Sequence, residues 1–385
     1  MSLTFDLALG FGVVALVAWA YLIALRGGFW LMRERDDRHE AAAPRTWPSV
    51  VAVVPARNEA DVIATSIGSL VAQDYPGAFR VILVDDNSED GTTAAAPGGA
   101  QGRLEVLRGA PLAPGWTGKL WAIKQGFDRA AEYAPDYVLF TDADIAHSPE
   151  NLTRLVARAE QGGLVLTSLM AQLTVETWAE RLMIPAFVFF FDMLYPFAWA
   201  NDPRRPLAAA AGGCMLVQRE ALARAGGVAA IRGELIDDCA LARTMKRQGP
   251  IWLGLTRRAW SLRPYRDLQA VGRMISRSAY AQLGYSPAIL AGTVLGMVVV
   301  YLAAPCLALF GHGAVRILGL LVWIAMAAAF QPMLRFYRRN PAWGAALPVI
   351  GALYTVFTLQ SALDSWRGRG GMWKGRSQAA VGVGS

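Results

Sequence analysis

Tyr137-Val138-Leu139-Phe140-Thr141-Asp142-Ala143-Asp144 is an apolar run that ends in two carboxylates one residue apart. Such a run is typical of a buried strand, and ligands of open α/β sheets bind at the carboxyl ends of the strands. Because successive side chains of a strand point to opposite faces, Asp142 and Asp144 share a face. Paired carboxylates there suit Mg²⁺ or Mn²⁺ held partly through a substrate's phosphates. The alternative is a turn in which the aspartates cap backbone groups without a metal.

Two further β-branched runs, residues 50–54 and 81–84, also predict buried strands. Between them an apolar face repeats at helical spacing across residues 60–73, and Pro76-Gly77 ends that pattern. Alternating strands and helices indicate a doubly wound α/β layer. The same patterns predict strands over 104–107, 164–169 and 208–217, and helices over 120–134, 149–161 (with Ser148 as its cap) and 219–225.

Polar clusters follow the predicted strands at the edge where a ligand would bind. Pro55 to Glu59 follow the first strand, and Asp85-Asp86 follow the second. The glycine-rich phosphate-binding patterns of Rossmann and P-loop proteins are missing from these strand ends, so carboxylates and a metal would have to hold any nucleotide. Gly118-Lys119 precedes a helix and would bring backbone N–H groups and a cation near phosphates. The alternative for Lys119 is a solvated side chain beside a glycine-capped turn.

Two clusters later in the chain complete the candidate residues. Gly212-Gly213, within a predicted strand, indicate a close approach by a ligand or by another backbone segment. Asp237-Asp238 lie at a predicted helix start, where the helix dipole stabilises carboxylates. Simple helix capping is therefore the alternative to a chemical role for this pair.

The composition is apolar for a soluble enzyme, with 54% hydrophobic and 17% charged residues among 385, and this indicates membrane spans. The net charge of +7 suits lipid headgroups, nucleotide phosphates or nucleic acid. The arginines cluster beside apolar segments and no platform of aromatic and basic residues occurs, so we expect no nucleic-acid partner. Three scattered cysteines and three scattered histidines indicate neither disulfides nor a zinc site.

Apolar runs near both ends are long enough to cross a bilayer as helices: residues 5–25, 288–310 and 315–334. A signal peptide is the alternative for the first run, but no positive segment precedes it. Arginines follow the first run and the run 315–334, so the positive-inside rule places the intervening catalytic segment in the cytoplasm. A further run, 343–363, either spans against that rule or forms a re-entrant or interfacial hairpin.

Two other segments are expected at the membrane surface. Residues 181–199 are apolar and aromatic but are interrupted, first at Pro185, which predicts an interfacial helix pair, with a buried core helix as the alternative. Residues 267–287 are expected to form an amphipathic interfacial helix on which Arg273 and Arg277 share a face. These arginines either meet the acceptor or the diphosphate, or form a solvated or membrane-facing basic surface.

In order and spacing, five clusters of this sequence resemble those of the family 2 inverting glycosyltransferases, which have the GT-A fold: Pro55 to Glu59, Asp85-Asp86, Asp142 with Asp144, Gly212-Gly213 and Asp237-Asp238. The resemblance covers roughly residues 48–266, and the flanking spans are similar to those of membrane-bound members such as ceramide glucosyltransferases. The most similar group is that of the hopene-associated glycosyltransferases, through Trp116-Thr117-Gly118-Lys119 and Trp373-Lys374-Gly375-Arg376. The resemblance implies an α/β, Rossmann-like GT-A (nucleotide-diphospho-sugar transferase) domain with N- and C-terminal transmembrane helices.

The resemblance also implies a role for each cluster. Asp238 is the expected general base, which takes the proton of the acceptor hydroxyl, and Asp237 stands where the family usually has Glu. Asp144, with Asp142, is expected to hold Mn²⁺ or Mg²⁺ on the donor diphosphate, so that no protein acid is required. Asp86 and the turn from Pro55 to Glu59 are expected to hold the base and ribose. The full set of expected donor-binding residues is Pro55, Arg57, Glu59, Asp85, Asp86, Lys119, Asp142 and Gly213.

One departure from the family concerns the acceptor. Processive members carry a Gln-x-x-Arg-Trp motif, whereas this sequence reads Gln269-Ala270-Val271-Gly272-Arg273-Met274, which speaks against polymer synthesis. We therefore expect transfer of a single sugar, with a UDP-sugar favoured as donor, to a membrane lipid, a hopanoid being one candidate, at the cytoplasmic face of the inner membrane. The alternatives are transfer to polyprenyl phosphate and a non-catalytic assembly protein with the same fold.

The expected organisation is that of a multi-pass membrane protein. It comprises an N-terminal transmembrane anchor (1–26), a linker (27–47), the GT-A glycosyltransferase domain (48–266, with the interfacial segment 181–199), an amphipathic interfacial helix (267–287), C-terminal transmembrane helices (288–364) and a basic tail (365–385).

Overall fold

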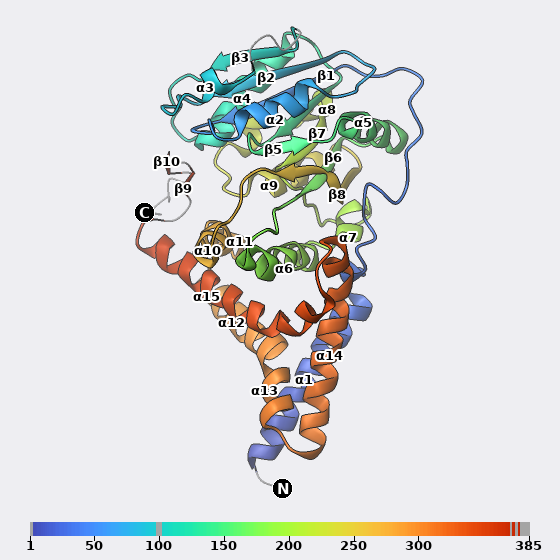
Figure 1. The fold of residues 1–385 in the computed structure, drawn as a ribbon, viewed down its shortest axis with the longest axis vertical. Helices are drawn as coiled ribbons and strands as arrows, with labels where there is room; N and C mark the ends of the chain where they lie inside the picture. The colour runs from blue at the N-terminus through green and yellow to red at the C-terminus, as the bar shows by residue number, and fades with distance from the viewer. Residues whose placement is uncertain (1–2, 98–101, 370–371, 374–375, 378–385) are drawn as a thin grey trace. The chain divides into compact units, whose positions relative to one another are not determined.

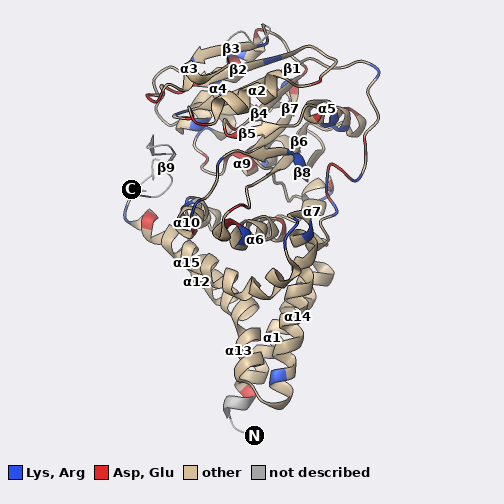
Figure 2. Cartoon of the chain, viewed as in Figure 1, with Lys and Arg blue, Asp and Glu red and all other residues tan. Residues whose placement is uncertain are grey.

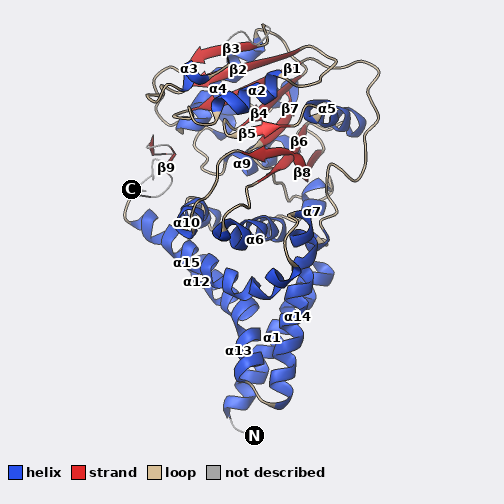
Figure 3. Cartoon of the chain, viewed as in Figure 1, coloured by secondary structure: helices blue, strands red, loops and turns tan. Residues whose placement is uncertain are grey.

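The computed structural model describes residues 3–97, 102–369, 372–373 and 376–377. The chain divides into two compact units. The first, here called the sheet unit, comprises Glu34–Thr174, Trp199–Arg263 and Gly371–Ser385. The second, the helical unit, comprises Met1–Arg33, Val175–Ala198 and Pro264–Gly370. Figure 3 shows that the strands of the main sheet all belong to the sheet unit.

Within its described residues, the sheet unit contains an eight-stranded sheet of order β3-β2-β1-β4-β7-β6-β8-β5 (Figure 1). Strands β3, β2, β1 and β4 are parallel, and β7 runs antiparallel to β4 and β6. The doubly wound layer expected from the sequence is confirmed, with an antiparallel strand inserted beside β4. The strands are β1 (Val50–Ala56), β2 (Phe79–Asp85), β3 (Leu104–Arg108), β4 (Tyr137–Thr141), β5 (Ile145–His147), β6 (Leu166–Gln172), β7 (Cys214–Gln218) and β8 (Ile251–Ser261).

Helices cover both faces of this sheet. Alternate residues of β1 enter two separate cores, Val53 on the face of α4 and Val54 on the face of α2. Gly126 lets α4 approach β1 closely, because a Cβ there would overlap Val53. The helices of this unit are α2 (Ile63–Val71), α3 (Thr92–Ala95), α4 (Gly118–Ala131), α5 (Asn151–Gly162), α8 (Arg219–Arg224) and α9 (Asp237–Lys246); α7 (Phe197–Asn201) lies at the boundary between the units.

The helical unit is built from long apolar helices. Four stretches in the described part of the chain are long and apolar enough to cross a membrane: Asp6–Leu25, Pro287–Phe310, Gly313–Phe336 and Pro341–Trp366. Figure 2 shows that α12 and α13 carry no charged residues. The helices are α1 (Leu3–Leu25), α6 (Trp178–Leu194), α10 (Leu268–Ser276), α11 (Ala279–Gln282), α12 (Pro287–Met297), α13 (Ala303–Phe310), α14 (Gly313–Phe336) and α15 (Leu347–Trp366).

Close packing holds the apolar helices together. A Cβ on Gly319 of α14 would lie 2.6 Å from the carbonyl oxygen of Ala304, so the two backbones meet closely, as small residues permit in membrane helices. The indole N–H of Trp19 in α1 donates to the carbonyl oxygen of Val300 at 2.8 Å. Val300 lies within a π-helical segment, Val298–Leu302, that joins α12 to α13.

Several expectations about local structure are wrong. Pro185 does not interrupt its segment, because it lies inside α6, a helix of 17 residues. The interfacial position of this segment stays a prediction. Ser148 does not cap α5; Glu150 occupies the cap position and its side chain makes no capping bond. Of the sequence motif that ends at Arg376, Lys374 and Gly375 lie outside the described residues.

Candidate active site

The Asp142-Ala143-Asp144 turn joins β4 to β5 at the carboxyl end of β4. Ala143 is buried in the core, whereas the side chains of Asp142 and Asp144 are 34% and 25% exposed. The two aspartates lie in a turn and not in the strand itself, and their carboxylates are partly exposed on either side of the buried Ala143.

Lys119, in the first turn of α4, lies between carboxylates from two distant parts of the chain. Its Nζ is 2.9 Å from Asp142 Oδ1 and 3.1 Å from Asp237 Oδ2. Burial by itself lowers the pKa of Lys119, but the carboxylates of Asp142 and Asp237 outweigh it and raise the pKa above the ordinary value. Lys119 is therefore an ammonium ion paired with two carboxylates, its side chain 16% exposed, and the alternative of a solvated lysine is wrong.

Asp238 lies next to this cluster, at the start of α9. Its Oδ2 accepts the Gly212 N–H at 3.0 Å, and its Oδ1 accepts the Cys239 N–H at 2.7 Å. Burial and the neighbouring Asp237 carboxylate raise the pKa of Asp238 to about 6. A carboxylate with a pKa near the working pH is suited to general-base catalysis.

The two glycines of the pair have different surroundings. A Cβ on Gly212 would lie 3.4 Å from Lys119 Nζ and 3.6 Å from Asp238 Oδ2, so this position faces the charged cluster. A Cβ on Gly213 would instead meet Ala171 Cβ at 3.2 Å, within the core. The predicted donor-binding residue Gly213 therefore packs against β6, and the residue beside the cluster is Gly212.

Arg263, which follows β8, pairs with the second carboxylate of the turn. Its Nε is 3.5 Å from Asp144 Oδ2, and its guanidinium also forms an ion pair with Glu59. Burial and the Asp142 carboxylate raise the pKa of Asp144, and Arg263 opposes that shift. Arg263 was not predicted because it belongs to no motif, and its approach to Asp144 depends on the pairing of β5 with β8.

The loops after β1 and β2 are tied to each other. Arg57 donates to the carbonyl oxygens of Asp86 and Asn87 at 2.5 and 3.2 Å. The Asp86 side chain is buried, and its Oδ2 is 4.0 Å from the Arg57 guanidinium. The Asp85 carboxylate accepts the Ser88 N–H at 3.0 Å, and so shapes the turn that follows β2. Pro55 lies within β1 and continues its pairing with β2.

The two predicted arginines of the acceptor region belong to the helical unit. Arg273 lies in the last turn of α10, and Arg277 caps its end, with its N–H donating to the Arg273 carbonyl oxygen at 3.1 Å. The carboxylate cluster belongs to the sheet unit. Their role at the acceptor stays a prediction.

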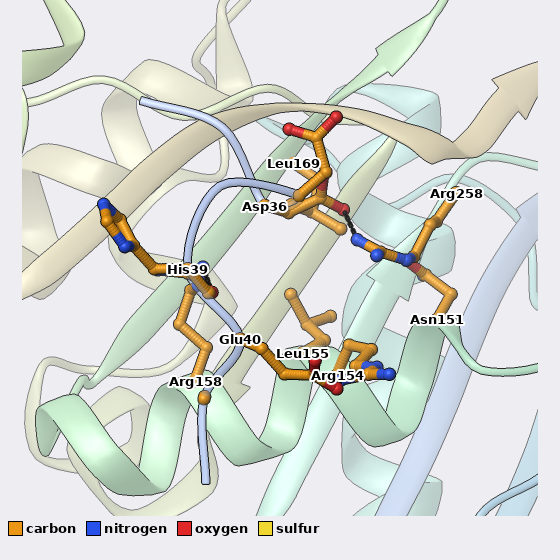
Figure 4. Close-up of a pocket in the computed structure, with 11 residues that line it drawn as sticks. Asp36, His39, Glu40, Asn151, Arg154, Leu155, Arg158, Leu169 and Arg258 are labelled. Carbon is orange, nitrogen blue, oxygen red and sulfur yellow. Dashed lines mark hydrogen bonds and ion pairs between the residues drawn. The ribbon is translucent and has the colours of Figure 1, made fainter. Parts of the chain in front are cut away.

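A cavity of about 70 Å³ lies in another part of the sheet unit, and no predicted site residue lines it (Figure 4). Its arginines are paired: Arg258 with Asp36 at 3.0 Å, Arg154 with Glu40, and Arg158 with the His39 carbonyl oxygen. These contacts fasten the segment after the first helix to α5 and β8. We assign this cavity a structural role.

The donor set of the turn fits a hard divalent cation. In the described part of the chain, no group of three or more His, Cys, Asp or Glu side chains is arranged to hold a metal. Two carboxylates on one face, completed by water and phosphate oxygens, are nevertheless a typical site for Mg²⁺ or Mn²⁺ with a nucleotide. Asp142 and Asp144 are the residues that would hold it, and the cation would stabilise the leaving diphosphate.

Comparisons with known proteins agree with this fold. Residues 51–226 match the family described as "Glycosyl transferase family 2". An N-acetylglucosaminyltransferase of Mesorhizobium japonicum is 30% identical over 190 residues, which cover 46% of this chain and 41% of that protein. An undecaprenyl-phosphate 4-deoxy-4-formamido-L-arabinose transferase of Pseudomonas aeruginosa is 33% identical over 101 residues, which cover 26% and 29%. The chain thus spans well under half the length of these relatives.

A solved structure is similar over nearly the whole chain. The mannosyltransferase of Pyrobaculum calidifontis, in complex with GDP-Man and Mn²⁺, has a TM-score of 0.53 and 18% sequence identity, and the match covers 92% of this chain and 98% of that one. At this identity the likeness is one of fold. Residues 51–226 thus match glycosyltransferase family 2 in sequence, and the chain shares the GT-A fold of this solved transferase.

Proposed function

We propose that this protein is a membrane-bound inverting glycosyltransferase that transfers one sugar from a nucleotide-sugar to a membrane lipid at the cytoplasmic face. One observation carries the proposal: Lys119 contacts both Asp142 and Asp237. Asp142, on the donor side, and Asp237, beside the expected base, therefore contact one ammonium ion. An inverting transfer needs that proximity, because the acceptor hydroxyl that the base deprotonates attacks the anomeric carbon on the face opposite the leaving diphosphate.

The roles of the residues follow from their contacts. Asp238 takes the proton of the acceptor hydroxyl, and its raised pKa supports that role. Asp237 and Asp142 hold Lys119 at the centre of the site. Asp144 and Asp142 are the ligands for Mn²⁺ or Mg²⁺. Arg57 and the loop that contains Asp86 form the site for the nucleobase and ribose of the donor. A cation held by the Asp142 and Asp144 carboxylates would neutralise the charge of the leaving nucleoside diphosphate.

The apolar helices support a lipid acceptor. Four described helical stretches are suited to span a membrane, and a relative is named as a transferase to undecaprenyl phosphate. The resemblance to the hopene-associated group favours a hopanoid, and the family favours a UDP-sugar. Polyprenyl phosphate is the second candidate acceptor, supported by the same relative; its phosphate is already an anion, so that transfer requires no general base.

The deciding experiment incubates the purified full-length protein with UDP- and GDP-sugars and either a hydroxylated hopanoid or polyprenyl phosphate, with products detected by mass. Asp238→Asn should abolish most transfer to a hydroxyl but spare transfer to polyprenyl phosphate. Absence of both transfer and nucleotide-sugar binding in the presence of Mn²⁺ would favour a non-catalytic assembly protein instead.

A further inference from the structure

Lys119 is placed to control access to the metal site. Its ammonium is 2.9 Å from Asp142 Oδ1, one of the two carboxylates that fit a divalent cation. A cation bound by Asp142 would stand close to this ammonium, and like charges at such a distance repel strongly in a partly buried site. Arg263 lies 3.5 Å from the other carboxylate, Asp144. Both metal ligands thus already have a cationic partner from the chain.

We propose that Lys119 withholds Asp142 from a divalent cation until a nucleoside diphosphate is present, and that its ammonium then moves to the diphosphate oxygens. The inference rests on the proposed donor site. The diphosphate supplies the negative charge that holds the cation, and it offers Lys119 a new partner when Asp142 is taken. Cation and nucleotide then bind cooperatively. The diphosphate draws the Lys119 ammonium away from Asp142, and the cation offsets the negative charge of the diphosphate beside the carboxylates.

The surroundings of Lys119 allow the movement. Asp237 also contacts the ammonium, at 3.1 Å, so that the charge stays paired when Asp142 is released. Gly212 leaves room beside Nζ, because a Cβ there would come within 3.4 Å. A lysine has a flexible stem and a compact charge with three donors, which suits transfer from a carboxylate to a phosphate. An arginine would lose its paired geometry in such a shift.

The experiment measures Mn²⁺ binding to the full-length protein by electron paramagnetic resonance, with and without UDP, and in parallel with GDP. The quantity of interest is the coupling factor, the ratio of the two Mn²⁺ affinities. In Lys119→Met we expect Mn²⁺ affinity without nucleotide to rise about tenfold, and the coupling factor to fall by a similar amount. Lys124→Met is the matched control, because Lys124 lies on the same helix and pairs with Asp128 at the surface.

Two further outcomes keep the inference distinct from simpler explanations. If Lys119→Met acts only through the loss of a positive charge at long range, Mn²⁺ affinity changes equally with and without nucleotide, and the coupling factor stays the same. An unchanged coupling factor in Lys119→Met would therefore overturn the inference. Asp237→Asn, which leaves the metal ligands intact, should change the coupling factor in the opposite direction. Lys119 then binds Asp142 more firmly, Mn²⁺ affinity without nucleotide falls, and the coupling factor rises. If the unmutated protein binds neither UDP nor GDP with Mn²⁺, the proposed donor site itself is wrong, and the inference is overturned with it.

Discussion

The Thr141 hydroxyl donates a hydrogen bond of 2.7 Å to the carbonyl oxygen of Gly213. Thr141 ends β4 directly before Asp142, and Gly213 follows the residue whose N–H binds Asp238. Because a hydroxyl has one proton, His147 Nε2 must be the donor in its 3.0 Å contact with Thr141 Oγ1. A buried threonine thus joins the metal-side turn to the glycine pair on the base side.

The state of His147 predicts how stability depends on pH. Burial lowers the pKa of His147 from its ordinary 6.5 to about 4. On acidification the unfolded chain therefore binds a proton before the folded chain does, and stability is lost as the pH falls from about 6.5 towards 4. The loss reaches about 3 kcal/mol at the acid end.

Thermal unfolding in detergent, from about pH 7 to about pH 4.5, measures this effect. His147→Asn should be less stable at neutral pH but should lose less on acidification. His39→Gln, at an exposed histidine, is the control and should keep the slope of the unmutated protein. Equal slopes with and without His147 would contradict the assignment.

Removal of the divalent cation should stop transfer. If Asp142 and Asp144 hold the ion, EDTA should abolish turnover, and Mn²⁺ or Mg²⁺ should restore it. Asp144→Asn should weaken donor binding, because it removes charge from the metal site that carries the diphosphate. Calorimetric titration of Asp144→Asn with UDP in the presence of Mn²⁺ measures the loss of donor binding. Full turnover in EDTA would contradict the assignment of the metal site.

Asp238→Asn should separate catalysis from binding. The substitution keeps the shape and one of the two accepted backbone hydrogen bonds but removes the proton acceptor, so kcat should fall by about 10²- to 10⁴-fold while donor affinity stays nearly the same. Steady-state kinetics with a hydroxyl acceptor, together with UDP binding, measure both quantities. If donor binding is lost and kcat is kept, the base lies elsewhere, and Asp237 is the next candidate.

The same residue should set the pH profile. Burial and Asp237 raise the pKa of Asp238 to about 6, and the base must be ionised to accept a proton. We therefore expect kcat to rise as the pH increases through about 6 and to level off above it. In Asp238→Asn the residual rate should lack this step. A step of unchanged position in that variant would assign it to another group.

The orientation of the sheet unit can be tested by labelling. Glu89 is exposed in the loop after β2, so a cysteine there should react with a thiol reagent. The arginines beside the apolar segments predict that a membrane-impermeant reagent labels Glu89→Cys only after the cells are opened. Cys306→Ser should be present throughout, because Cys306 is the exposed native cysteine in the described residues. Labelling of intact cells would contradict the predicted cytoplasmic position of the sheet unit.

The sequence by itself determined the parts of this protein that depend on local pattern. Buried strands such as 50–54 could be predicted because runs of β-branched residues favour a sheet buried on both faces. The apolar helices could be predicted because a bilayer requires about 20 apolar residues in succession. Asp142 and Asp144 could be predicted as a pair because they follow directly on a buried strand, one residue apart, at the edge where ligands bind.

Only the tertiary structure decided which of these groups meet. Lys119 and Asp237 are far apart in the sequence, and no periodicity indicates that α4 and α9 bring them within 3.1 Å. Arg263 reaches Asp144 because β5 pairs with β8, a pairing that depends on the packing of the whole sheet. Ser148 has a residue type that favours helix caps, but Glu150 occupies the cap position of α5. The N–H of Ser148 instead donates to the carbonyl oxygen of Arg258 at 2.7 Å. Local preferences are worth at most about 1 kcal/mol per residue, and the contacts of a folded core outweigh them.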